Sequence, residues 1–181
     1  MSDCPECKAC EIVEGVLIGF FNKILFDPGQ KRGYKVMFQS GVKACRNAKC
    51  CAVCGLVWTD LNVEDLKKYI LTKCNEKFAS KIYNSGDPES SSQANCVNCG
   101  LKGKITGELF SVDYSASVSF KPNNLIIYKF NNLPYIEIEQ TSGCCTNCGL
   151  ITTRLNSKEI NRILLKYCKP KYLKQIYSCD E

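Results

Sequence analysis

Cysteine pairs separated by two residues constrain this chain more than any other feature of its sequence. Two pairs lie in the first half, at Cys4 with Cys7 and Cys51 with Cys54. Two lie in the second half, at Cys96 with Cys99 and Cys145 with Cys148. A Cys-x-x-Cys turn directs two sulfurs to one point, and two such turns supply the four thiolates of a tetrahedral zinc site. A glycine follows the second pair of each half, as expected where a tight turn needs a positive φ. The spacing predicts two Zn²⁺ ions per chain.

The rest of the cysteine content supports metal binding over disulfides. The chain of 181 residues has 15 cysteines and no histidine, which excludes His-based acid–base catalysis and His-ligated metal sites. An odd count fits a fully paired disulfide framework poorly. The N-terminus lacks the pattern of a signal peptide, and the longest early apolar stretch, residues 15–21, is too short for a membrane span. We therefore expect a cytoplasmic or nuclear protein without membrane contact, where clustered cysteines bind metal.

The cysteine pattern belongs to a longer internal repeat. The first pair recurs after 92 residues, and from residue 26 onward the offset is 94. At that offset Cys50–Leu56 matches Cys144–Leu150, and Cys74 matches Cys168. The segment between the copies is polar and Ser-rich, the composition of a linker. The sequence thus predicts one zinc-ribbon module at 1–83, a linker at 84–95 and a second module at 96–181.

Each copy has the same predicted order of elements. About 40 residues of strand-like sequence follow the first cysteine pair, with predicted strands in the second copy at 105–112, 116–120, 125–130 and 135–139. A short strand follows the second pair, at 56–59 or 150–153. A helix closes each copy, because Asn62 and Asn156 each lie three residues before an acidic residue, the pattern of an N-cap.

We therefore expect an α+β, β-rich fold of two tandem repeats, each an antiparallel zinc-ribbon-like sheet followed by a C-terminal helix. The alternative architecture is one fused domain in which the two modules pack pseudo-symmetrically.

The order Cys-x-x-Cys … Cys-x-x-Cys-Gly resembles that of the zinc-ribbon superfamily. In particular, Cys-Pro-x-Cys at Cys4 and Cys-x-x-Cys-Gly-Leu at Cys51, followed by a strand and a helix, is similar to small uncharacterised zinc-ribbon proteins of bacteria and other microbes. This resemblance covers most of each copy and implies a fold and a metal but no particular function. Tandem ribbons also resemble the small ribbon subunits and cleavage factors of RNA polymerase, although this sequence shows no acidic finger such as an Asp-Glu pair in a ribbon hairpin, and its cysteine pairs are more widely separated.

Alternatives remain at the first predicted site. Cys10, Cys45 or Cys50 could replace a ligand there, although the repeat favours Cys4, Cys7, Cys51 and Cys54. Cys10 and Cys45 have no counterpart in the second copy and could hold a further labile metal or be surface thiols. Cys74 and Cys168 fall on the apolar face of the predicted helices, where we expect core packing. Iron–sulfur ligation also uses four thiolates. Thioredoxin-type chemistry is less compatible, because these pairs precede strand-like sequence rather than a helix.

Basic residues mark the last predicted helix. Arg154, Lys158, Arg162 and Lys166 recur every four residues, and the last three share one helix face, which could follow a line of phosphates. A solvated helix face is the alternative interpretation, since the first copy has Glu64 and Thr72 at the positions of Lys158 and Lys166. The net charge of +6 falls to about +2 if each Zn²⁺ with four thiolates contributes about −2.

The sequence contains no phosphate-binding loop, nucleophile elbow or carboxylate pair with catalytic spacing. It predicts a non-enzymatic zinc-binding protein with two structural Cys4 sites, acting as a binding or adaptor module for nucleic acid or a protein partner. The alternative is a redox or metal-transfer protein that uses the surplus cysteines Cys10, Cys45 and Cys50. The oligomeric state does not follow from the sequence.

Overall fold

Strands and short helices make up the described part of the chain. The computed structural model describes residues 3–19, 23–28, 41–83, 95–111, 117–123, 125 and 135–178. The first half supplies β1 (Ile12–Ile18), β2 (Ile24–Asp27), β3 (Val42–Lys43), β4 (Asn47–Cys51), β5 (Leu56–Asp60), α1 (Val63–Lys73) and α2 (Glu76–Tyr83). The second half supplies β6 (Lys104–Ser111), β7 (Ser119–Pro122), β8 (Ile136–Glu137), β9 (Thr141–Cys145), β10 (Leu150–Arg154), α3 (Ser157–Tyr167) and α4 (Pro170–Tyr177).

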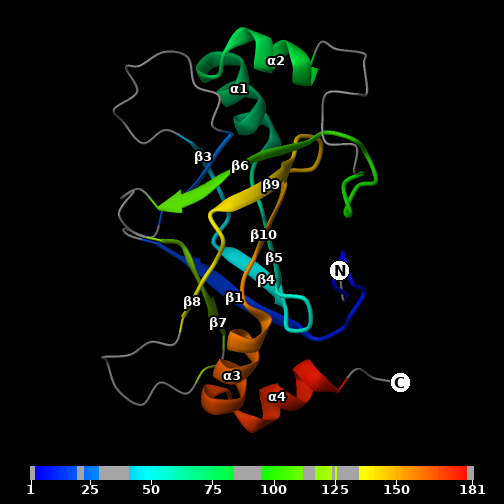
Figure 1. Cartoon of the computed structure of the whole chain (residues 1–181), viewed down its shortest axis with the longest axis vertical. Coiled ribbons are helices and arrows are strands. Elements are labelled where there is room, and N and C mark those ends of the chain that lie inside the picture. Colours follow the sequence, from blue (N-terminus) through cyan, green and yellow to red (C-terminus); the bar gives the residue numbers. More distant parts are fainter. Residues whose placement is uncertain are drawn as a thin grey trace.

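All of these strands belong to one curled antiparallel sheet (Figure 1), in the order β3-β2-β6-β9-β10-β5-β4-β1-β7-β8. At its centre β5 pairs with β10, and Trp58 lies opposite Thr152, the residue 94 positions later. Outward from this pair, strands that correspond in the two halves take corresponding places. Strands β1 to β5 of the first half correspond to β6 to β10 of the second. If each strand is replaced by its counterpart, the order read from one edge becomes the order read from the other. The sequence repeat appears as a pseudo-twofold symmetry within a single sheet.

The prediction of two tandem zinc-ribbon repeats, each with its own sheet, is wrong. Strand β2 of the first half pairs with β6 of the second, and β7 of the second half pairs with β1 of the first. Each half thus gives its second and third strands to the other half. The alternation of apolar residues predicts that a strand exists, but it does not specify which strand edge it joins. The predicted boundaries at residues 83 and 96 stay predictions, and the linker, apart from Asn95, lies outside the described residues.

Glycine and phenylalanine account for this exchange of strands. In β1, Val13, Gly15 and Leu17 face inward, and a Cβ on Gly15 would lie 2.4 Å from the ring of Phe120 in β7. A Cβ on Gly107 in β6 would likewise lie 2.5 Å from the ring of Phe26 in β2. Both phenylalanine rings are fully buried. Each half therefore leaves a space over its own glycine that a ring from the other half fills.

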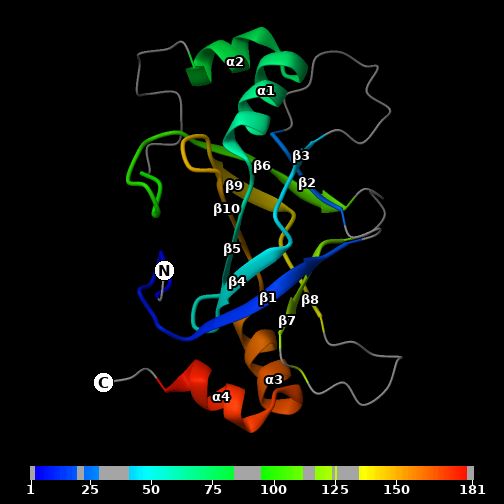
Figure 2. The same cartoon turned by 180° about the vertical axis from the view of Figure 1, so that it is seen from behind.

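Helical hairpins lie at the two ends of the long axis, with α1 and α2 at one end and α3 and α4 at the other (Figures 1 and 2). The predicted N-caps are confirmed, because Asn62 Oδ1 accepts from Asp65 N at 3.1 Å and Asn156 Oδ1 accepts from Lys158 N at 3.0 Å. The single predicted helix of each half is in fact two. Extended backbone at Cys74 and Cys168 ends α1 and α3, and a second short helix follows. Within the described residues, none of the helices is long and apolar enough to cross a membrane.

Two apolar clusters occupy opposite faces of the sheet. The larger contains inward residues of the strands and the buried sides of all four helices, including Leu66, Ile70, Ile160 and Leu164. The smaller contains Leu56, Trp58 and Leu150 together with all of the paired cysteines except Cys7, which is exposed. Val57, between Leu56 and Trp58, belongs to the larger cluster, as expected when successive strand residues point to opposite faces. The cysteine groups therefore cover the sheet face that the helices leave free.

Candidate metal centres

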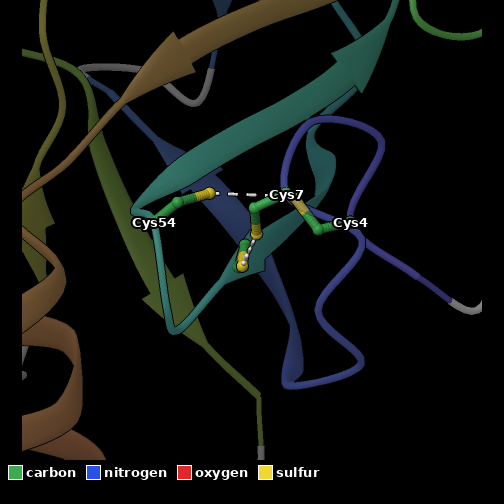
Figure 3. A group of neighbouring side chains, drawn as sticks. Cys4, Cys7 and Cys54 are labelled. Atoms are coloured by element: carbon green, nitrogen blue, oxygen red, sulfur yellow. Dashed lines mark hydrogen bonds between the residues drawn. The ribbon is translucent and has the colours of Figure 1, made fainter.

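Eight cysteines gather in two groups of four. Site 1 consists of Cys4, Cys7, Cys51 and Cys54, and site 2 of Cys96, Cys99, Cys145 and Cys148. Within each group all sulfurs lie within 4.8 Å of one another. Figure 3 shows Cys4, Cys7 and Cys54 of site 1. These are the eight residues that the spacing singles out, and either group could hold a metal ion.

The sulfur spacing suits one tetrahedral ion. In site 1, Cys4 Sγ lies 3.7 Å from Cys54 Sγ, and Cys7 Sγ lies 3.6 Å from Cys51 Sγ. In site 2, the corresponding distances are 3.6 Å from Cys96 to Cys148 and 3.7 Å from Cys99 to Cys145. Four sulfurs at about 2.3 Å from a central zinc would be about 3.8 Å apart. The donors present therefore fit a single metal ion.

Tight turns position the sulfurs. The turn between β4 and β5 is closed by a hydrogen bond from Gly55 N to Cys51 O at 2.9 Å, and Gly149 N donates to Cys145 O at the same distance. Gly55 has φ +73° and Gly149 φ +74°, so the predicted need for glycine is confirmed. The N-terminal pairs have the same construction, with Gly100 N bonded to Cys96 O and Lys8 N bonded to Cys4 O. Lys8 adopts φ 63° there, a position that sequence reasoning missed because it is not a glycine.

Each second turn contacts the opposite half of the chain. Leu155 N, before α3, donates to Gly55 O at 2.9 Å, and Leu61 N, before α1, donates to Gly149 O at 3.0 Å. A Cβ on Gly55 would lie 2.2 Å from Leu155 O. Site 1 is thus built against the start of the helix of the second half, and site 2 against that of the first.

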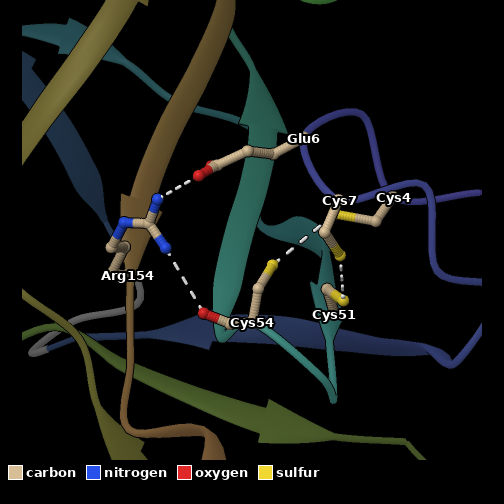
Figure 4. Close-up of polar contacts among 6 residues, drawn as sticks. All are labelled: Cys4, Glu6, Cys7, Cys51, Cys54 and Arg154. Atoms are coloured by element: carbon tan, nitrogen blue, oxygen red, sulfur yellow. Dashed lines mark hydrogen bonds and ion pairs between the residues drawn. The ribbon is translucent and has the colours of Figure 1, made fainter.

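Site 1 has additional contacts with the second half (Figure 4). Arg154 in β10 donates to the Cys54 carbonyl at 3.3 Å and forms an ion pair with Glu6, which lies between Cys4 and Cys7. Asn161 in α3 donates to the Ala52 carbonyl at 2.8 Å. Sequence reasoning missed both contacts, and it assigned Arg154 to the row of basic residues that continues with Lys158, Arg162 and Lys166. The position that matches Glu6 is Asn98, whose amide NH₂ lies 3.6 Å from Cys148 Sγ.

Burial and hydrogen bonding set the thiol pKa values. Burial raises the pKa of Cys54, and it raises the pKa of Cys145 to about 12. Burial also acts on Cys96, but hydrogen bonds from the amides of Cys99 and Asn98 and from neighbouring thiols outweigh it and lower its pKa to about 7. The thiols with a raised pKa, Cys51, Cys54, Cys145 and Cys148, therefore hold their protons at neutral pH without metal. An incoming cation must displace those protons, so its binding strengthens as the pH rises.

The surplus cysteines divide into buried and exposed residues. Cys50 is fully buried, and burial raises its pKa well above the usual value, so it is a core residue beside Cys51 and not a member of site 1. Cys74 and Cys168 are buried in the larger apolar cluster, which confirms their predicted core packing. Cys45 is an exposed free thiol. Cys10 belongs to neither group of four and is not a free thiol in the structure.

The four basic residues that recur every four positions, Arg154, Lys158, Arg162 and Lys166, have different surroundings in the structure. Lys158, Arg162 and Lys166 are exposed on α3. Arg154 precedes the helix and is bound to Glu6, so it belongs to the surroundings of site 1. Binding of nucleic acid by any of these residues stays a prediction.

Comparisons of the chain with protein families, with curated proteins and with solved structures find no significant match. The resemblance to zinc ribbons accordingly rests on the cysteine spacing and on the two sulfur groups, and membership of that superfamily stays a prediction.

Proposed function

We propose that this protein is a non-enzymatic zinc protein in which two Cys4 sites stabilise the fold and the assembled surface serves as a binding or adaptor module. The observation that carries the proposal is the presence of two groups of four sulfurs, each within 4.8 Å. Four thiolates complete the coordination of zinc, so such a site has no open position for a substrate. This coordination is typical of structural zinc.

A single ion is favoured over an iron–sulfur cluster. In a cluster, several iron ions and sulfides stand between the cysteine sulfurs and hold them farther apart than around one ion. All four sulfurs of each site lie within 4.8 Å of one another, which supports one ion per site. A mononuclear iron would use the same geometry, and elemental analysis distinguishes it from zinc.

The place of the sites in the fold supports a structural role. Among the described residues, the strands give the smaller apolar cluster only Leu56, Trp58 and Leu150 as large buried side chains, and cysteines of both sites complete it. Metal bound there would hold the loops of residues 4–10 and 96–101 against this face of the sheet. The free energy of metal binding would then contribute directly to folding.

The redox or metal-transfer alternative depends on the surplus cysteines. Of its three residues, Cys50 is fully buried with a raised pKa, and Cys10 lies in neither sulfur group. Cys45 is exposed, but it lies in neither sulfur group. The alternative therefore has less support than the structural role.

Metal content tests the proposal. Protein purified without added metal should contain about two zinc ions per chain by elemental analysis, and Cys51→Ser or Cys145→Ser should lower the content to one or fewer. Cys45→Ser is the matched control and should keep both ions. Iron in place of zinc, or less than one ion in the unsubstituted protein together with reversible disulfides, would make the redox alternative the better account.

A further inference from the structure

The two ends of the molecule have the same fold but different charge. Helices α1 and α2 form one end, and α3 and α4 form the other (Figures 1 and 2). Residues 63–83 contain five lysines against three carboxylates. Residues 157–177 contain six cationic side chains against one carboxylate, Glu159. The charge of the molecule is therefore concentrated at the α3–α4 end.

The pseudo-symmetry supplies an internal comparison for these cations. The six are Lys158, Arg162, Lys166, Lys169, Lys171 and Lys174. The matching residues at the other end are Glu64, Lys68, Thr72, Asn75, Lys77 and Ser80. Helices α1 and α2 fold in the same arrangement with cations at only two of these six positions, Lys68 and Lys77. The fold itself therefore does not require a cation at the other four positions.

The cations are available to a ligand. All six side chains are exposed. Among the described residues, Arg162 alone of the six forms an ion pair, at 3.4 Å from Glu159, and 74% of its side chain remains exposed. Lys158, Arg162 and Lys166 present one cation on each of three successive turns, about 6 Å apart along the helix axis. Such a row can meet consecutive phosphates of a nucleic-acid backbone.

The buried side of α3 disfavours a membrane surface as the ligand. An interfacial helix inserts its apolar face between lipid headgroups. In α3 that face consists of Ile160, Ile163 and Leu164, which are buried against the sheet. A backbone of phosphates requires only the charged face and no insertion.

We propose that the α3–α4 surface, defined by these six cations, binds the sugar-phosphate backbone of nucleic acid without reading its sequence. This inference names the partner class of the binding module proposed above and rests on that function. Arg154 is not part of the surface, because Glu6 neutralises it.

Paired charge variants test the surface in the zinc-loaded full chain. Lys158→Gln, Arg162→Gln and Lys166→Gln are combined in one protein. Lys68→Gln, Lys73→Gln and Lys77→Gln, all exposed at the α1–α2 end, are combined in the control. Both proteins have the same net charge, so a difference between them reports the position of the charge. Metal content and melting temperature verify that both remain folded.

The readout is fluorescence anisotropy with labelled 24-base-pair DNA and RNA duplexes of arbitrary sequence at about 50–200 mM NaCl. We expect the unsubstituted protein to bind with micromolar affinity at the lower salt concentration, with a linear dependence of log K on log salt. The α3 variant should lower the slope by about 2 to 3, since each phosphate contact contributes about 0.9. The α1–α2 control should leave the slope nearly unchanged.

Three outcomes would overturn the inference: no duplex binding by the unsubstituted protein, equal slopes for the two variants, or binding only to vesicles that contain anionic lipid. If any of these occurs in protein with two zinc ions per chain, this inference alone fails. Protein without metal would instead contradict the proposed function.

Discussion

At the scale of single residues, the contact between the two halves depends on the glycine after each second cysteine pair. Gly55 has φ +73°, and a Cβ there would lie 2.2 Å from Leu155 O. We predict that Gly55→Ala lowers the free energy of unfolding by about 3 kcal/mol or more, because backbone strain adds to a clash with a carbonyl that cannot move freely. Chemical denaturation of the metal-loaded protein measures this loss.

Gly100 provides a matched control for that substitution. Its φ of +72° is nearly the same, but an added Cβ would meet nothing within 4 Å. Gly100→Ala should therefore cost only about 1 kcal/mol, the contribution of the left-handed backbone. Equal losses for Gly55→Ala and Gly100→Ala would mean that the contact with Leu155 contributes nothing.

Thiol reactivity is a second property of single residues. Burial raises the pKa of Cys50 and of Cys144, so both thiols stay protonated at pH 8 and are shielded from reagents. Cys45 is exposed. In metal-loaded protein at pH 8 we predict that iodoacetamide labels Cys45 at least tenfold faster than Cys50 or Cys144, as measured by peptide mass spectrometry. Labelling of Cys50 at the rate of Cys45 would contradict its burial and revive the redox alternative.

At the scale of elements, local signals were predictable and pairing partners were not. Asn62 and Asn156 were identified as N-caps because an N-cap acts within three residues of itself, and both are confirmed. The ends of α1 and α3 were missed, since Cys74 and Cys168 continue the apolar period of the helix while the backbone turns away. The cysteine groups were predicted because ligand spacing is also local within each pair. The pairing of β2 with β6 depends on a glycine and a ring about 80 residues apart.

The strand exchange makes its own prediction. The Phe26 ring from β2 fills the space over Gly107 in β6. Phe26→Ala should lower the free energy of unfolding by about 3–5 kcal/mol and leave a cavity at the β2–β6 pair. Hydrogen exchange should then accelerate at residues 104–111, in the opposite half of the sequence.

Phe120→Ala is the symmetric control for Phe26→Ala. The Phe120 ring lies over Gly15, so its loss should accelerate exchange at residues 12–18. If each substitution instead accelerated exchange only within its own half, the two halves would not exchange strands.

At the scale of the whole molecule, a duplicated sequence has produced one sheet instead of two separate sheets. The strands β5 and β10 join the halves at the centre, and the exchanged strands join them again on both sides. Site 1 lies against Leu155 and Asn161 of the second half, and site 2 against Leu61 of the first. Comparison of the two halves of the sequence detects the repeat but not the exchange of strands between the halves. An offset of 94 residues describes separate and interleaved copies equally well.

The connected sheet changes the expected effect of losing one metal. In two separate modules, Cys51→Ser would unfold residues 1–83 and leave the remainder intact. In the interleaved sheet, metal at site 1 supports the β4–β5 turn, the central β5–β10 pair and the contacts with Leu155. Because these features connect the two halves, loss of site 1 lowers the stability of both halves together. We predict that calorimetry of Cys51→Ser and of Cys145→Ser shows a single transition, lowered by at least 10 °C from that of the unsubstituted protein. Cys45→Ser should melt within about 2 °C of the unsubstituted protein, as a surface substitution does. Two transitions, one of them unchanged, would show that the halves fold independently and would contradict the cooperative sheet.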